Sequence, residues 1–318
     1  MTEMKASQAP VKPDLRTEIC GISFQNPVIA ASGTFGFGRE YAEYTDLNKL
    51  GGISVKGLTR KPRKGNPPPR IAETPAGILN SVGLQNPGVE AFLREELPFL
   101  LSHQKLVVLA NAAGSTPDEY LEMVEILSDS AVHAIELNVS CPNVKEGGVT
   151  FGGTPKSLYQ TVDAVRKLCG KPLIVKLTPN TDDIGSLAKA AEAAGADAIS
   201  LINTITGMKV DIHTRRPVLK NNTGGLSGPA IMPVAVRMTY QAAAAVKIPV
   251  IGMGGIASGD DAVEFLLCGA TAVMVGTANF TDPAACGEVI DGIEEYLTRH
   301  HESCVSGIVG TLKLWSGV

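Results

Sequence analysis

Short apolar runs rich in β-branched residues recur along the chain, and segments of helical periodicity separate them. The separating segments include Ile184–Ala194 and Asp260–Leu267. Near-continuous apolar strands alternating with helices are typical of a parallel sheet that helices cover. Eight such units predict a (β/α)8 barrel, and a doubly wound sheet is the alternative. The eight predicted strands are Pro27–Ala31, Gly52–Lys56, Leu106–Ala110, Ala134–Asn138, Leu173–Leu177, Ala198–Ile202, Pro249–Met253 and Ala272–Val275.

The length of the chain fits one domain of this kind. Its 318 residues would permit two domains, but α/β barrels routinely use about 250 residues or more as one unit. We therefore expect a barrel domain over residues 15–318, preceded by a mobile tail over residues 1–14. Ser303–Val318 is an apolar extension whose docking the sequence does not indicate.

The charge balance excludes two classes of partner. The chain has 28 Lys and Arg against 32 Asp and Glu, a net charge of -4, and no basic block that would neutralise nucleic-acid phosphates. Met1–Leu15 lacks an apolar signal core, and no apolar run approaches the roughly 20 residues that span a bilayer. We expect a soluble, cytoplasmic protein that binds neither nucleic acid nor membrane.

The cysteines predict no metal site, because none lies in a C-x-x-C motif or in a Cys/His cluster of short spacing. Scattered cysteines in a long intracellular chain are expected to be reduced and to behave as small apolar residues. The six are Cys20, Cys141, Cys169, Cys268, Cys286 and Cys304.

Two long connections and a ring of polar residues indicate where the function lies. Gly57–Lys105 and Asn203–Met232 are rich in Gly, Pro and Asn, and each follows the carboxyl end of a predicted strand, where barrel active sites lie. Polar side chains also gather at the strand ends, so we expect them to surround the barrel mouth. They are Ser32, Thr34, Lys56, Asn111, Asn138, Lys176, Asn203 and Thr204.

Lys176 needs a partner, because a lysine in a strand buried on both faces is costly without one. Two partners remain open at this point. One is an internal ion pair with Glu136 of the neighbouring predicted strand. The other is a bound ligand that is, or becomes, anionic.

Three glycine runs predict a phosphate site. Gly252–Ile256 and Gly276–Thr277 follow the seventh and eighth predicted strands, and Gly224–Gly228 precedes the helix before the seventh. Barrel loops after these two strands commonly bind phosphate through backbone N–H groups. No G-x-G-x-x-G motif follows the first strand, so a Rossmann domain is not indicated.

Cys141 is the cysteine whose neighbours suggest chemistry. It follows the fourth predicted strand within Leu137–Asn143 and is succeeded by the glycine-rich Lys145–Gly148. A thiol at this position can act as a nucleophile or base if its thiolate is stabilised. The structural alternative is an inert buried cysteine, which we expect for the other five.

Four asparagines, Asn80, Asn138, Asn143 and Asn203, could converge at the mouth. Their amides offer donors and acceptors without charge, which suits the imide edges of a pyrimidine ring. Asparagines also make turns, so each one alone would be structural. Lys56 beside them could meet a carboxylate or a phosphate.

With these residues in view, the chain resembles the class 1 dihydroorotate dehydrogenases, and within them the class 1B catalytic subunit. The resemblance extends from about Leu15 to Thr311, and the Asn-x-Ser-Cys-Pro-Asn motif is its most specific part. The Lys-Glu-Gly-Gly continuation is what resembles class 1B. Besides the glycine runs, the matching stretches are Ala31–Gly38, Lys56–Thr59, Asn80–Asn86, Asn138–Gly148, Val175–Pro179 and Asn203–Thr204.

The resemblance implies an FMN-containing barrel that oxidises dihydroorotate to orotate in pyrimidine biosynthesis. It implies that Cys141 removes the C5 proton while hydride leaves C6 for the flavin, and that Lys176 lies near the flavin N1–C2=O edge. The implied FMN residues are Ser32, Lys56, Gly57, Asn111, Asn138, Lys176, Ile202, Gly228, Gly254, Gly255, Gly276 and Thr277. The implied substrate residues are Lys56, Asn80, Ser81, Val82, Gly83, Leu84, Asn138, Asn143, Asn203 and Thr204.

The resemblance also implies a partner. In class 1B a second subunit, which carries FAD and a 2Fe–2S cluster, passes electrons to NAD. The resemblance implies that two catalytic subunits form the homodimer core of a heterotetramer with it. This chain has neither a four-cysteine cluster motif nor a Rossmann fingerprint, so we expect such a relay on another chain. The alternatives are a related FMN barrel that acts on another dihydropyrimidine, and a flavin-binding scaffold without catalysis.

Overall fold

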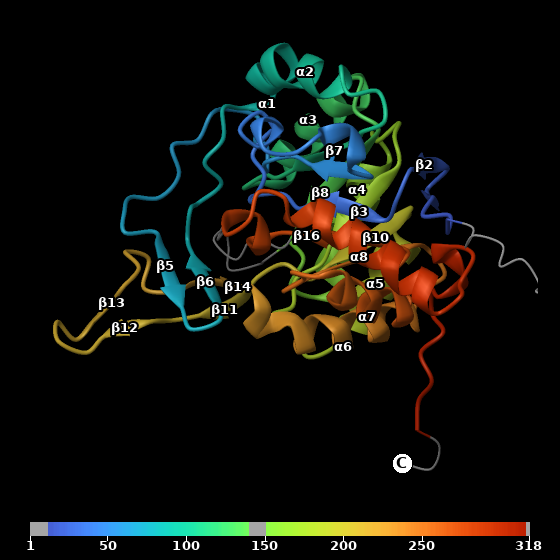
Figure 1. Ribbon diagram of the computed structural model, residues 1–318. Helices are drawn as coiled ribbons and strands as arrows, with labels where there is room; N and C mark the ends of the chain where they lie inside the picture. The colour runs from blue at the N-terminus through green and yellow to red at the C-terminus, as the bar shows by residue number, and fades with distance from the viewer. Residues whose placement is uncertain (1–11, 140–150, 316–318) are drawn as a thin grey trace, which may run out of the picture.

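Eight strands form a closed parallel barrel in the computed structural model, which describes residues 12–139 and 151–315 (Figure 1). Neighbouring strands follow chain order, and β16 pairs with β3 to close the ring. The (β/α)8 prediction is therefore confirmed, and the doubly wound alternative is wrong because no edge of this sheet is left unpaired. The strands are β3 (Val28–Ala30), β4 (Gly52–Ser54), β7 (Val107–Ala112), β8 (Ala134–Asn138), β9 (Leu173–Lys176), β10 (Ala198–Leu201), β15 (Val250–Met253) and β16 (Ala272–Val275).

Two strands end two residues away from their predicted carboxyl ends. Asn111 lies inside β7 rather than after it, because its carbonyl still accepts a hydrogen bond from the Leu58 N–H. β4 ends at Ser54, and Lys56 lies beyond it because the Lys56 N–H donates to the Gly36 carbonyl in the preceding βα loop. Both residues still lie at the carboxyl end of the barrel.

Helices surround the barrel and begin at residues that cap them. Thr116, Thr154, Asp183 and Ser258 accept hydrogen bonds from backbone N–H groups of the first turn in four of the helices. Their apolar faces then pack on the strands. The helices are α1 (Val89–Ala91), which continues through the π-helical Phe92–Glu96 into α2 (Leu97–Leu101), then α3 (Pro117–Ser128), α4 (Pro155–Arg166), α5 (Ile184–Ala193), α6 (Met232–Ala243), α7 (Gly259–Leu267) and α8 (Ala285–Arg299). Short 3-10 turns are η1 (Tyr41–Glu43), η2 (Leu47–Lys49), η4 (Pro229–Ile231), η5 (Thr277–Phe280) and η6 (Val305–Gly307).

A hairpin closes the amino-terminal end of the barrel. It consists of the antiparallel strands β1 (Thr17–Ile19) and β2 (Ile22–Phe24). Ile19 and Phe24 are both 1% exposed and pack with inward-facing strand residues such as Ile174. This end of the barrel interior is therefore apolar and filled.

The two long connections form one structure, which the sequence did not predict. Strands from both pair in a four-stranded antiparallel sheet of order β11-β14-β6-β5, which projects from one side of the barrel (Figure 1). Its small core contains Ala72, Leu79 and Leu219. The strands are β5 (Ile71–Thr74), β6 (Gly77–Asn80), β11 (Ile205–Gly207) and β14 (Gly224–Ser227), with a smaller hairpin of β12 (Val210–Asp211) and β13 (Arg216–Pro217) beyond.

The chain ends dock on each other. The Asp14 N–H donates to the Ser303 carbonyl, and the Val305 N–H donates to the Asp14 carbonyl. Val305 and Ile308 are buried, and the Leu312 N–H donates to the Leu267 carbonyl at the end of α7. Residues 12–14, which the sequence assigned to the tail, thus lie against the barrel, whereas residues 1–11 lie outside the described residues.

None of the five described cysteines, all except Cys141, forms a disulfide. Cys169, Cys268 and Cys286 are buried as expected, whereas Cys20 and Cys304 are only half-buried. No helix among the described residues is long and apolar enough to cross a membrane.

Candidate active site

The barrel interior changes from apolar to polar toward the carboxyl ends of the strands. Because alternate residues of a strand share a face, Leu109 and Asn111 point the same way, as do Ile174 and Lys176. The earlier residue of each pair, Leu109 or Ile174, belongs to the apolar cluster inside the barrel. The later one, nearer the carboxyl end of the strand, is buried and polar. Five neighbouring strands, β4, β7, β8, β9 and β10, contribute such polar residues. They are Ser54, Asn111, Glu136, Lys176 and Ser200.

Glu136 is the centre of this cluster and is fully buried. Its Oε2 accepts hydrogen bonds from Ser54 Oγ at 2.6 Å and Asn111 Nδ2 at 2.5 Å. Its Oε1 accepts from Ser200 Oγ at 2.7 Å and lies 4.0 Å from Lys176 Nζ. Burial acts to raise the pKa of Glu136, but the Lys176 charge and the three hydrogen bonds outweigh it, so the pKa is lowered and the carboxylate stays ionised.

Lys176 has two partners among the described residues. Besides Glu136, its Nζ donates to Ser32 Oγ at 3.1 Å. The ion pair with Glu136, one of the two readings left open by the sequence, is therefore present. The ammonium lies at the carboxyl end of β9, and one of its three donors bonds Ser32.

Asn111 connects the carboxylate to Asn138. Glu136 can only accept hydrogen bonds, so Asn111 turns its NH2 group toward it and its Oδ1 toward Asn138 Nδ2, at 3.3 Å. The Asn138 carbonyl in turn accepts from the buried Tyr120 hydroxyl at 2.9 Å. Gly57 borders Asn111, because a Cβ added to Gly57 would lie 3.1 Å from Asn111 Oδ1.

The three glycine runs meet beside this cluster. A Cβ on Gly255 would lie 2.9 Å from the Gly228 carbonyl oxygen, and one on Gly228 would lie 3.4 Å from Thr277 Cγ2. Thr277 Oγ1 bonds Ser227 Oγ at 2.9 Å. A Cβ on Gly254 would lie 3.3 Å from Ile202 Cγ1, which brings Ile202 to the same place. Gly228, Gly254 and Gly255 have positive φ angles, a conformation in which glycine is favoured.

This glycine cradle, formed by Gly228, Gly254, Gly255, Gly276 and Thr277, presents backbone donors. Within the described part of the chain, the N–H groups of Gly254, Gly255, Gly276 and Thr277 donate to no protein acceptor. Clustered backbone N–H groups without protein acceptors form a typical binding site for a phosphate group.

The residues expected to bind substrate lie on the projecting sheet and the loops next to it. Asn80 of β6 pairs with Gly225 of β14, and Thr204 Oγ1 lies within 2.0 Å of where a Gly225 Cβ would stand. Leu84 reaches Gly57, since its Cδ2 lies 3.4 Å from the position of a Gly57 Cβ. Asn203 also lies here, and its Oδ1 accepts from the Thr204 N–H. The structure thus connects Asn80, Leu84, Asn203 and Thr204 to the barrel mouth.

Two polar groups in this region have no partner among the described residues. Ser81 Oγ is buried and makes no hydrogen bond. Lys56 Nζ forms neither a hydrogen bond nor an ion pair with residues 12–139 or 151–315. Burial, with a smaller contribution from the charge of Arg70, lowers the pKa of Lys56. A buried hydroxyl such as that of Ser81 and a half-buried ammonium such as that of Lys56 are usually satisfied by a ligand or by water.

Cys141 and Asn143 lie outside the described residues, so the position of the expected base relative to the mouth is not described. The last described residue before them, Val139, is buried directly after β8.

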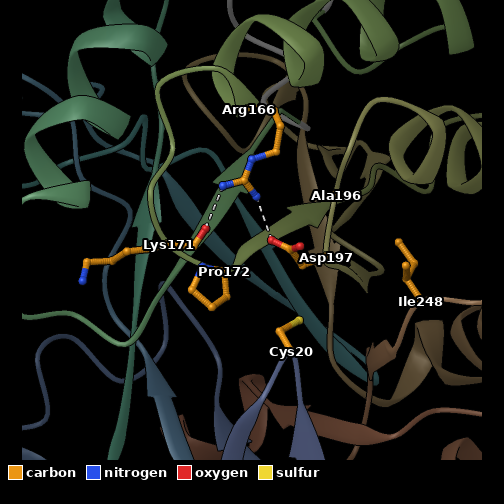
Figure 2. Close-up of a pocket in the computed structure, with 7 residues that line it drawn as sticks. All are labelled: Cys20, Arg166, Lys171, Pro172, Ala196, Asp197 and Ile248. Atoms are coloured by element: carbon orange, nitrogen blue, oxygen red, sulfur yellow. Dashed lines mark hydrogen bonds and ion pairs between the residues drawn. The ribbon is translucent and has the colours of Figure 1, made fainter.

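A cavity of about 560 Å³ lies at the opposite end of the barrel and has a structural explanation (Figure 2). Arg166 donates to Asp197 Oδ2 at 2.7 Å and to the Lys171 carbonyl at 3.0 Å, and Asp197 also accepts from the Leu173 N–H. These bonds fasten the end of α4 to the first residues of β9 and β10. Amino-terminal faces of barrels serve stability, and this cavity is not the candidate site.

Sequence reasoning missed Ser54 and Ser200 as members of the site. The available signal was their spacing, since each is a polar residue on the inward face of an otherwise apolar strand. Glu136 was considered only as a partner for Lys176, whereas it also fixes Asn111.

The fold and the mouth together define the class of protein. A closed (β/α)8 barrel with a buried charged cluster and a glycine cradle at the carboxyl ends of its strands has the architecture of a barrel enzyme. A family model described as dihydroorotate dehydrogenase matches residues 14–297. The chain belongs to the dihydroorotate dehydrogenase family.

Relatives agree over nearly the whole chain. A protein of Thermoanaerobacter sp. (strain X514) is 56% identical over 301 residues, which cover 95% of this chain and 99% of the relative. One of Alkaliphilus oremlandii (strain OhILAs) is 56% identical over 299 residues, 94% and 99% of the two chains. One of Caldicellulosiruptor bescii is 54% identical over 301 residues, 95% and 100%. Each is named dihydroorotate dehydrogenase B (NAD(+)), catalytic subunit.

The residues at the mouth fit the FMN that the resemblance implies. The glycine cradle supplies donors for a phosphate and leaves no room for Cβ atoms at Gly254 and Gly255, which would lie 2.7 Å from Ala235 and Met232. The Lys176 ammonium suits the flavin edge that becomes negative on reduction.

Proposed function

We propose that this protein oxidises dihydroorotate to orotate, a step of pyrimidine biosynthesis, with FMN as the hydride acceptor. The observation that carries the proposal is the arrangement of the mouth. A fixed Lys176 ammonium, an asparagine pair and a glycine cradle lie together in a chain of the dihydroorotate dehydrogenase family.

The cofactor residues act in two groups. The glycine cradle and Ile202 would hold the phosphate end through backbone N–H groups and close packing. Ser32, Lys56, Gly57, Asn111, Asn138 and Lys176 would hold the flavin ring. Bound FMN would supply the hydride acceptor. Lys176, which Ser32 and Glu136 hold in position, would stabilise the negative charge that reduction places on the flavin.

The substrate residues would bind a planar, anionic ring. Lys56, whose ammonium has no partner among the described residues, meets the carboxylate. Ser81 offers its unpartnered hydroxyl, and amide groups read the ring edges. The full set is Lys56, Asn80, Ser81, Val82, Gly83, Leu84, Asn138, Asn143, Asn203 and Thr204. Cys141 would remove the C5 proton, and its thiol suits that role because a thiol ionises more readily than a hydroxyl.

The electrons would leave through a partner. Relatives named catalytic subunits of an NAD(+)-dependent enzyme support a second, electron-transferring chain. We propose that the partner chain carries FAD and a 2Fe–2S cluster. Two partner chains would bind a homodimer of the present protein, giving a heterotetramer.

Anaerobic titration of the FMN-loaded protein tests the reaction. Dihydroorotate should bleach the flavin absorbance near stoichiometrically, and dihydrouracil, which lacks the carboxylate that Lys56 would meet, should not. Equal bleaching by both would favour a broader dihydropyrimidine dehydrogenase. Tight orotate binding without bleaching would favour a non-catalytic scaffold.

A further inference from the structure

Glu136 is a buried charge for which the proposed reaction has no direct use. It is fully buried inside the barrel, and four donor groups from β4, β7, β9 and β10 surround its carboxylate. Burying a carboxylate is costly, and hydrophobic residues could fill the same volume with equal or better stability. A buried carboxylate with this many partners therefore calls for a role besides packing.

Two of its partners, Asn111 and Lys176, are residues that the proposed function assigns to the flavin. Glu136 bonds Asn111 directly, and Asn111 bonds Asn138. On its other oxygen it faces Lys176, which reaches Ser32. Ser54 and Ser200 complete the carboxylate shell and keep both oxygens in fixed directions. Two chains of contacts thus run from one carboxylate to the mouth.

We propose that Glu136 is a positioning residue that holds Lys176 and Asn111 in the orientation that binds and tunes the flavin. The inference rests on the proposed function. The carboxylate places a counter-charge 4.0 Å from Lys176 Nζ, which offsets the cost of burying the ammonium at the mouth. As an obligate acceptor, the carboxylate also sets which way the Asn111 amide faces, and Asn111 sets the Asn138 amide.

The test is a double-mutant cycle between Glu136→Gln and Lys176→Met, read out on the midpoint potential of the bound flavin. If Glu136 acts through Lys176, Glu136→Gln shifts the potential, and Lys176→Met then adds much less than it does in the wild-type protein. The shifts of residues that act as one unit do not sum. Simple addition of the two shifts, or no shift in Glu136→Gln, would overturn the proposal.

A second measurement, the affinity of the apoprotein for FMN, tests the proposal without catalytic turnover. Glu136→Gln should weaken FMN binding to the apoprotein by about tenfold, the range expected for loss of a charged hydrogen-bond partner. Asp197→Asn is the matched control, because it removes a paired carboxylate at the other end of the barrel. The control should lower the thermal unfolding temperature and leave the FMN affinity and potential unchanged. If Glu136→Gln behaves like this control, its role is structural only.

A folding failure of Glu136→Gln leaves the proposal testable. The double variant Glu136→Gln/Lys176→Met removes both charges and should be more stable than Glu136→Gln alone, because no unpaired charge remains buried. A double variant no more stable than the single one would contradict the pairing. Wild-type protein that takes up no FMN would refute the proposed function instead, whereas additive shifts in a protein reduced by dihydroorotate refute only the role of Glu136.

Discussion

Lys176 and Ser32 are joined across the barrel mouth by a hydrogen bond of 3.1 Å between Nζ and Oγ. Lys176 lies on β9, and Ser32 follows β3, which is four strands away in either direction round the closed barrel. The ammonium is therefore held over the centre of the mouth between two opposite walls. A group fixed in this way can stabilise developing charge without reorganising.

Lys176→Met should slow flavin reduction by dihydroorotate by about 10²–10³-fold, the usual effect of removing one preorganised electrostatic group from a site. Stopped-flow absorbance under anaerobic conditions measures the rate. Lys189→Met, on the exposed face of α5, is the control and should leave the rate unchanged. A Lys176→Met protein reduced as fast as the wild type would show that the ammonium has no part in the reaction.

Gly255→Ala should weaken FMN binding strongly. The added Cβ would lie 2.7 Å from Met232 Cβ and 2.9 Å from the Gly228 carbonyl oxygen, at a φ of +85° that favours glycine. The cradle must therefore shift. Quenching of FMN fluorescence on titration with the apoprotein measures the affinity.

The matched control is Gly287→Ala, in α8. A Cβ there meets nothing within 4 Å, so this change should leave FMN affinity intact and stabilise the helix by about 0.5–1 kcal/mol. Equal FMN affinity in the two alanine variants would place the phosphate elsewhere.

The lowered pKa of Lys56 predicts that the stability of the apoprotein depends on pH. Because its pKa in the folded protein lies below the ordinary value of 10.5, the charged form disfavours folding, and this cost is full below the lowered pKa. Stability of the wild type should therefore rise relative to Lys56→Met as the pH increases from that pKa toward 10.5. Thermal unfolding of both proteins across this range checks the sign. Parallel curves would mean that the ammonium is as well solvated as in the unfolded chain.

Cys141→Ser should reduce the rate of flavin reduction at neutral pH by about 10²–10⁴-fold, the range typical of losing a general base, because a serine hydroxyl ionises far less readily. Orotate affinity should change little, since the hydroxyl replaces the thiol with nearly the same shape. Flavin spectral shifts on orotate binding give the affinity, and stopped-flow reduction gives the rate. Equal losses in both would mean that Cys141 is structural.

The sequence predicted the barrel because each of its strands has a recognisable pattern within a few consecutive residues. Runs such as residues 173–175 and Ala272–Val275 are apolar on both faces, and that pattern predicts a buried strand without knowledge of its neighbours. The projecting sheet escaped prediction for the opposite reason. β14 reads Gly-Gly-Leu-Ser and has no strand pattern of its own, so its pairing with β6 depends on a contact between segments far apart in the chain.

The residues of the candidate site likewise fall into those that a local pattern predicts and those that depend on contacts between distant segments. The glycine runs and Lys176 were identifiable because a barrel places the ends of its strands together. The spacing of Ser54 and Ser200 marks an inward-facing polar residue, but a lone serine does not indicate which side chain it bonds. Their function appears only when β4 and β10 bring them to the same Glu136 carboxylate.

The most direct test of the account is anaerobic addition of dihydroorotate to the purified, FMN-loaded protein, followed by flavin absorbance. We predict rapid bleaching with release of orotate, followed by recovery of the absorbance when NAD and the electron-transferring partner are supplied. A protein that takes up no FMN, or whose bound flavin stays oxidised in the presence of dihydroorotate, would contradict the account.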